Sequence, residues 1–230
     1  MTKKTPEKKE ELDGQIKSAN GGEAGKTGDD ESLKKKVLDA ALPDAEFDGF
    51  SDTVLAKAGE KVGAEKTDLA RLFPEGPLSL IEYYSLWADA EVERRLAAMD
   101  LKQMKVRERI AAAVLARLSI LKPHKEVARR AAAALALPMH APTAARLMYH
   151  SVDAMWRAVG DTSTDFNFYT KRGILAGVYG ATLLRWFNDS SKDESATAGF
   201  LAARIENVMQ FEKFKAGAKK VLAKFRPSSS

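Results

Sequence analysis

Apolar residues recur at helical spacing from Leu33 almost to the end of the chain. No segment sustains the alternation of apolar and polar positions that a half-buried strand requires. Glycine and proline fall between the apolar runs, where helices end. The pattern therefore predicts an all-α fold with helices at 33–42, 52–62, 66–73, 77–99, 103–121, 125–137, 142–159, 165–187, 192–210 and 211–225.

The first 32 residues lack this pattern. Beyond Met1, the large apolar side chains up to Glu31 are Leu12 and Ile16, and five glycines are spread among mixed charges. Such a segment buries too little apolar surface to offset the conformational entropy it would lose on folding. We therefore predict a disordered tail over residues 1–32.

Residues 33–75 form the first predicted unit, in which two helices and a short third one precede a longer helix. This layout resembles the helix-turn-helix head of TetR-family regulators. From Lys57 to Glu75, however, four basic residues face four acidic ones, and Glu65 and Asp68 stand where a DNA reader needs donors. We favour a structural three-helix cap, and keep a TetR-type ligand-responsive DNA-binding repressor as the alternative.

Composition narrows the classes further. The chain has 230 residues, and 37 basic against 32 acidic residues give a net charge of +5. Cysteine is absent, which excludes disulfides, thiolate metal sites and cysteine nucleophiles. No apolar run approaches the length of a membrane span, and no apolar signal-peptide core precedes the helices. An intracellular protein is the expectation.

Catalytic signatures are missing from the sequence. The three histidines, His124, His140 and His150, form no metal-ligand spacing. No nucleophile elbow, phosphate loop, dinucleotide fingerprint or carboxylate-rich di-iron pattern occurs. We therefore expect no metal, no organic cofactor and no enzymatic activity.

The most specific segment is SVDAMWRAVGDTSTDFNFY, from Ser151 to Tyr169. A capped helix turn explains its polar residues, since Gly160 can end one helix and Thr162 can begin the next. It does not explain the aromatic residues around that turn. The run STDFNFY, with the Tyr-containing helix and the DSS that follow it, resembles the accessory lipid-binding family of ubiquinone (coenzyme Q) biosynthesis.

This resemblance implies a TetR-like all-helical homodimer that holds an isoprenoid or quinone-like lipid and binds the demethoxyubiquinone hydroxylase at a membrane. The family's partner-binding patch corresponds here to Asp165, Phe168, Tyr169, Met155 and Asp153. Phe168 stands where the family has Trp, so the apolar anchor is kept and an indole N–H donor is lost.

The helix predicted at 165–187 carries glycines inside an apolar sequence. Each mid-helix glycine costs about 1 kcal/mol relative to alanine, so close packing of a backbone or a flat lipid is expected beside it. One interpretation is core plus dimer interface. The other is a lipid cavity lined by Trp156, Gly173, Ile174, Gly177, Val178 and Leu184.

Residues 211–230 follow the helical body predicted at 76–210 and form a basic amphipathic segment. Its apolar positions fall within a narrow arc and lysines flank them, which is typical of an interfacial membrane helix. The alternative is a terminal helix docked on its own domain. The expected membrane contacts are Phe211, Phe214, Val221, Leu222, Phe225, Lys215 and Lys219.

Together these features predict a non-enzymatic lipid-binding protein whose partners are the hydroxylase, membrane lipid and a second copy, with no nucleic acid. A scaffold without a ligand is a further alternative. The expected location is cytoplasmic and peripheral on the inner face of a bacterial membrane, or on the matrix side of the mitochondrial inner membrane in a eukaryote.

Overall fold

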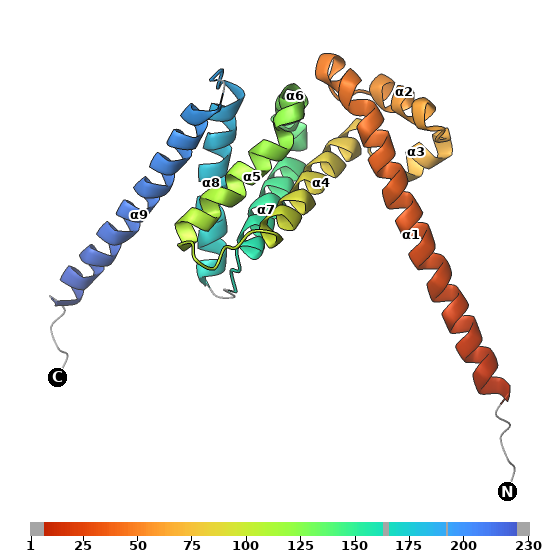
Figure 1. Cartoon of the computed structure of the whole chain (residues 1–230), viewed down its shortest axis with the longest axis horizontal. Helices are drawn as coiled ribbons and strands as arrows, with labels where there is room; N and C mark the ends of the chain where they lie inside the picture. The colour runs from red at the N-terminus through yellow and green to blue at the C-terminus, as the bar shows by residue number, and fades with distance from the viewer. Residues whose placement is uncertain (1–6, 163–165, 192, 225–230) are drawn as a thin grey trace, which may run out of the picture. The chain divides into compact units, whose positions relative to one another are not determined.

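The computed structural model describes residues 7–162, 166–191 and 193–224, with side chains described for 28–162, 168–191 and 193–210. Every regular element in these ranges is a helix, so the all-α prediction is confirmed. The helices, drawn in Figure 1, are α1 (Glu7–Asp48), α2 (Asp52–Val62), α3 (Lys66–Leu72), α4 (Pro77–Ala97), α5 (Val106–Leu121), α6 (Lys125–Leu135), α7 (Ala141–Ala158), α8 (Phe166–Phe187) and α9 (Ser195–Lys224), with short 3₁₀ turns at Lys122–His124 and Pro138–His140.

Two of these helices differ from the prediction. Helix α1 begins at Glu7, so the tail predicted to be disordered over 1–32 is helical from that residue. No proline interrupts residues 7–42, and Glu, Lys and Ala favour the helix, so the glycines there weaken it without ending it. Helix α9 continues through residues 210 and 211, where two helices were predicted, because neither Gly nor Pro occurs between Gly199 and Gly217.

The chain divides into two compact units, residues 1–83 and 84–230. In the first unit, α1 and α2 bury Val37, Leu38, Ala41, Val54 and Ala58 between them. Ser51 caps α2 by accepting a hydrogen bond from the Val54 N–H. Gly59 lets α3 pack closely, since a Cβ there would lie 2.4 Å from Leu69 Cδ1. These contacts form the three-helix head that the sequence predicts.

The second unit contains α8, which carries glycines and, in its first turn, the pair Phe168 and Tyr169; this pair is called the aromatic turn below. Helices α8 and α9 lie side by side (Figure 1), and α5 and α7 pack against them. Gly160, with a φ of 86°, ends α7 in the left-handed conformation that glycine adopts freely. Trp186 is fully buried and donates its indole N–H to Glu194 Oε1 at 2.8 Å, which fixes the corner between α8 and α9.

A buried polar network lies in the interior of the second unit. The Asp89 carboxylate accepts hydrogen bonds from Arg117 Nε at 2.7 Å and from Ser151 Oγ at 3.0 Å, and His150 Nδ1 lies 3.0 Å from it. Arg117 also donates to the Tyr179 hydroxyl. Burial raises the pKa of the Tyr179 phenol, although the neighbouring guanidinium acts to lower it. The network therefore ties α4, α5, α7 and α8 together through paired charges.

Candidate functional site

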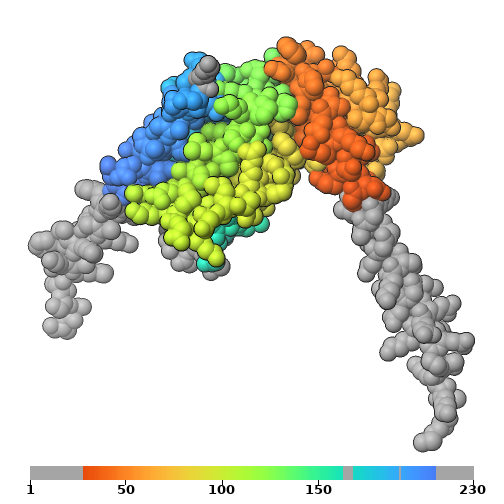
Figure 2. Space-filling view, in the orientation of Figure 1, coloured from red at the N-terminus to blue at the C-terminus, as the bar shows by residue number. Residues whose placement is uncertain are grey.

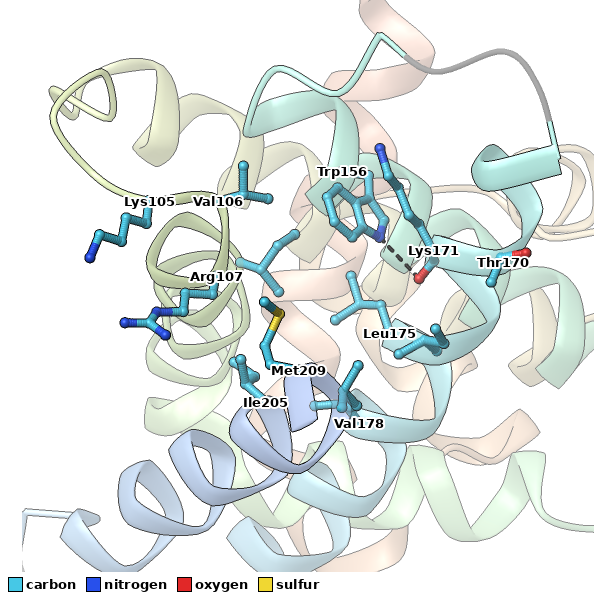
Figure 3. Close-up of a pocket in the computed structure, with 13 residues that line it drawn as sticks. Lys105, Val106, Arg107, Trp156, Thr170, Lys171, Leu175, Val178, Ile205 and Met209 are labelled. Carbon is cyan, nitrogen blue, oxygen red and sulfur yellow. Dashed lines mark hydrogen bonds between the residues drawn. The ribbon is translucent and has the colours of Figure 1, made fainter. Parts of the chain in front are cut away.

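An apolar cavity of about 570 Å³ lies between α5, α8 and α9 (Figure 3). This volume is within the range of ~300–1,000 Å³ that is usual for small-molecule sites. Most of its lining is aliphatic or aromatic. The lining residues are Lys105, Val106, Arg107, Ile110, Trp156, Thr170, Lys171, Ile174, Leu175, Val178, Ile205, Val208 and Met209.

A second hollow of about 420 Å³ adjoins the first along α8 and α9. The two share Ile174, Val178 and Val208, so these side chains stand at their junction. Gly177 and Ala181 line the second hollow from α8, where their small size leaves the space open.

Trp156 forms one wall of the larger cavity and is held in place by Lys171. The Trp156 indole N–H donates to the Lys171 carbonyl oxygen at 3.2 Å. The Lys171 ammonium lies 5.3 Å from the centre of the indole ring and 2.8 Å from Asp161 Oδ1. The indole thus keeps its polar edge satisfied while its apolar face borders the cavity.

The aromatic turn next to this wall rests on a buried arginine. Arg172 is 3% exposed and bonds both Asp153 Oδ1, at 2.6 Å, and Asp161 Oδ2, at 3.2 Å. It also donates to the Phe168 carbonyl oxygen, at 3.2 Å. Phe168 is half-buried and meets Tyr169 edge-on, with ring centres 5.1 Å apart. Tyr169 is 68% exposed, so the turn presents an aromatic side chain to the outside.

The structure brings together only part of the predicted partner-binding set. Asp153 lies beneath the turn, paired with Arg172 and Arg157. Met155 is 1% exposed, so it belongs to the core under this surface and is not a surface contact itself. Asp165 lies outside the described residues.

The predicted lipid-binding residues also separate into two groups. Trp156, Ile174 and Val178 line the larger cavity, and Gly177 lines the adjoining hollow. Gly173 and Leu184 lie on the exposed face of α8 and line neither hollow, with Leu184 64% exposed. Because successive residues of an α-helix are rotated by about 100°, Gly173 and Leu184 point in a different direction from Ile174 and Val178 around the axis of α8.

Several site residues were not predicted from the sequence. The α9 wall comes from Ile205, Val208 and Met209, whose i, i+3, i+4 spacing does mark an apolar helical face. Val106 and Ile110, one turn apart, supply the α5 wall. The importance of Arg172 had no distinctive signal in the sequence, because Lys171 and Arg185 are cations on the same helix.

The predicted membrane residues Phe211, Phe214, Val221, Leu222, Lys215 and Lys219 lie on the C-terminal half of α9, where side chains are not described. Phe225 lies outside the described residues. Among the helices that the structure describes, none combines the length and the apolar character needed to cross a bilayer.

In the described residues the fold is all-helical, and an apolar cavity lies next to the first turn of α8, where Tyr169 is exposed. The COQ9 family model matches residues 141–212, which comprise α7, α8 and the cavity-lining part of α9. The resemblance to the ubiquinone biosynthesis accessory family is thereby confirmed, and curated relatives extend it beyond this segment.

The mitochondrial ubiquinone biosynthesis protein COQ9 of Bos taurus is 33% identical over 187 residues, covering 78% of this chain and 58% of the bovine protein. Its counterpart in Rattus norvegicus is 33% identical over 187 residues, covering 78% and 60%. The Homo sapiens protein is 31% identical over 186 residues, covering 78% and 58%. The chain therefore spans about three-fifths of the length of these relatives.

Proposed function

We propose that this protein is a non-enzymatic lipid-binding accessory factor of ubiquinone biosynthesis. Its guest is an isoprenoid or quinone-like precursor, held in the cavity between α5, α8 and α9. The single observation that carries the proposal is that cavity of about 570 Å³ with its aliphatic lining. The names of its relatives supply the pathway.

The chemistry of the cavity wall supports binding over catalysis. Nine of its thirteen lining residues are apolar, and the polar four are Lys105, Arg107, Thr170 and Lys171. Burying an isoprenoid chain among aliphatic side chains is favourable in proportion to the apolar area removed from water. Neither a carboxylate nor an imidazole is among these described lining residues. Of the two ammonium groups that could transfer a proton, that of Lys171 is paired with Asp161 and that of Lys105 extends away from the cavity (Figure 3).

The aromatic turn is the proposed site of presentation to the demethoxyubiquinone hydroxylase. Tyr169 is exposed while Phe168 and Arg172 hold its backbone in place. Lys171, two residues further along α8, lies against the cavity wall. A partner docked on Tyr169 would therefore sit within a turn of helix of the bound guest.

The head supports the structural role over DNA reading. Arg71, the arginine of α3, is paired with Asp30 and Asp68. Glu65, at the start of α3, is exposed and would repel phosphate. Because Arg71 is already paired with carboxylates of the head, it is not free to pair with DNA phosphates. The arrangement therefore does not support the alternative of a DNA-binding repressor.

The proposed assembly is a homodimer that associates peripherally with a membrane. The exposed face of α8, with Gly173 and Leu184, offers a surface on which a second copy can pack closely. The relatives are named as mitochondrial proteins, which favours the matrix side of the inner membrane if the source is a eukaryote.

The experiment is lipid extraction from protein purified out of cells that make ubiquinone, followed by mass spectrometry. We expect an isoprenoid or quinone-like species in near-stoichiometric amount. Protein that carries no such lipid, in cells that contain it, contradicts the proposal.

A further inference from the structure

The connection between α4 and α5, residues 98–105, exposes apolar and basic side chains together. Met99 is 46% exposed and Val106, the first residue of α5, is 56% exposed. Lys102, Lys105 and Arg107 are exposed among them. We propose that this loop and the first turn of α5, residues 98–107, are a docking surface for an anionic lipid bilayer at the mouth of the cavity.

The backbone of the loop is held in place by hydrogen bonds from the Arg109 side chain. Arg109 Nε donates to the Met104 carbonyl at 2.9 Å, and its other nitrogens reach the carbonyls of Lys102, at 3.3 Å, and Val159, at 3.4 Å. One guanidinium thus joins two loop carbonyls to the end of α7. The exposed side chains are therefore carried on a fixed backbone.

The charge of this surface is complementary to anionic headgroups. Residues 98–107 contain three bases, Lys102, Lys105 and Arg107, and one acid, Asp100, which gives 3 − 1 = +2. In Figure 3 the charged ends of Lys105 and Arg107 extend away from the cavity. Cations whose stems lie on apolar surface and whose heads point outward are arranged as they are at membrane interfaces.

Acidic side chains on α5 itself and on α9 limit this positive field without reversing it. Glu108 and Glu206 approach Arg107 at 4.0 and 3.8 Å, and both are exposed to solvent that screens them. Lys102 and Lys105 precede Arg107 in the loop, and neither takes part in these ion pairs with Glu108 and Glu206. They are the cations that we expect to contribute most to binding.

The loop lies at the mouth of the cavity, so a bilayer bound to it would be next to the proposed lipid site. Lys105, Val106 and Arg107 line the cavity that Ile205 and Met209 of α9 close from the other side. Figure 2 shows the yellow-green loop region and the last described side chains of α9, in blue, at the same end of the second unit. A bilayer bound there would face the cavity mouth, so a lipid could pass between them without crossing water. This passage of lipid rests on the proposed function, whereas the binding of the bilayer does not.

A polarity-sensitive fluorophore on a single cysteine tests the contact. The chain contains no cysteine, so Met99→Cys gives one labelling site in the full-length protein. Met139→Cys is the matched control, since Met139 is 75% exposed and precedes α7, at the end of that helix opposite Val159. With phosphatidylcholine–phosphatidylglycerol vesicles, we expect a blue shift at position 99 and none at position 139. With phosphatidylcholine alone, we expect no shift at either.

Charge reversal tests the electrostatic part. Lys102→Glu/Lys105→Glu should weaken binding to the same anionic vesicles by about 25-fold or more, since each base is worth about fivefold near such a surface. The Lys105 backbone N–H donates to the Glu108 carboxylate, so the start of α5 does not depend on the lysine side chain. Arg146→Glu/Arg185→Glu, with the same change of charge on exposed sites of α7 and α8, should weaken it far less.

The inference is overturned if the protein binds these vesicles and the dye at position 99 shows no blue shift. It is also overturned if the two charge-reversed variants lose binding equally. Absence of any vesicle binding overturns it too. Lipid extraction from the same preparations separates the two proposals, because a filled cavity in a protein without loop contact leaves the proposed function intact.

Discussion

The guanidinium carbon of Arg172 lies 3.4 Å from the centre of the Phe168 ring, one helical turn away on α8. The same guanidinium is bonded to Asp153 of α7 and to Asp161 of the turn between the helices. A single buried cation therefore fixes the backbone from which Tyr169 projects. The position of this exposed aromatic side chain is therefore set by charge pairing as well as by packing.

Replacing Arg172 with leucine should destabilise the second unit by about 2–3 kcal/mol. Asp161 and Asp153 would lose the buried cation that they share and would keep only the more exposed Lys171 and Arg157. Urea unfolding followed by circular dichroism measures this loss. Arg157→Leu is the control, since Arg157 pairs with the same Asp153 from an exposed position and should cost at most about 1 kcal/mol. Equal effects of the two changes would show that burial of Arg172 does not matter.

Replacing Arg117 with methionine should cost about 3–5 kcal/mol, since Asp89 is 1% exposed and would lose the buried cation that it pairs with. The double change Arg117→Met/Asp89→Asn should be less harmful than the single one, because the buried carboxylate is removed as well. Unfolding free energies of the two singles and the double give the coupling. Strict additivity would contradict the pairing.

The corner between α8 and α9 should lose stability in acid through Asp189. Its carboxylate accepts hydrogen bonds from the hydroxyl and backbone N–H of Ser191 and of Thr197, which hold the pKa of Asp189 well below its usual range. Because the pKa of Asp189 is lower in the folded chain than in the unfolded chain, the ionised carboxylate stabilises the fold at pH values above the unfolded-state pKa. This contribution disappears as the pH falls below about 4. Asp189→Asn should be less stable than the wild type near pH 7, and the gap should close in acid. A gap that is constant with pH would contradict this assignment.

Replacing Gly173 with leucine should shift the proposed homodimer toward monomer. A Cβ at Gly173 meets nothing within 4 Å in one copy, so the change is tolerated inside the subunit and blocks close approach from outside. Light scattering during gel filtration measures the mass. Ala133→Leu, on the exposed face of α6, is the control and should leave the mass unchanged. A dimer that persists in Gly173→Leu would exclude this face as the interface.

The helices follow from the sequence because their signals are local. The start of α2 at Ser51–Asp52 and the end of α7 before Gly160 depend on residues that are neighbours in the chain. The prediction of two helices at 192–210 and 211–225 was wrong because it followed the change to a basic amphipathic pattern at residue 211. The lack of Gly and Pro between Gly199 and Gly217 was the local signal of one continuous α9.

The site was only partly predictable, because it depends on which helices face each other. The composition of α8 indicated an apolar wall. The spacing of its apolar residues, however, could not distinguish the face of Ile174 and Val178, which lines the cavity, from the exposed face of Gly173 and Leu184. Arg172 acquires its role from Asp161, whose side chain comes from another element. Such pairing between elements leaves no trace in local spacing.

The most direct measurement of the central claim is the isoprenoid content of two tryptophan variants of α8. Ile174 lines both hollows and Leu184 lines neither. Ile174→Trp should fill the junction of the hollows and lower the bound lipid, measured by mass spectrometry per mole of folded protein, by at least tenfold, about 1.4 kcal/mol of binding. Leu184→Trp should retain the wild-type content. Equal lipid content in the two variants would contradict the account.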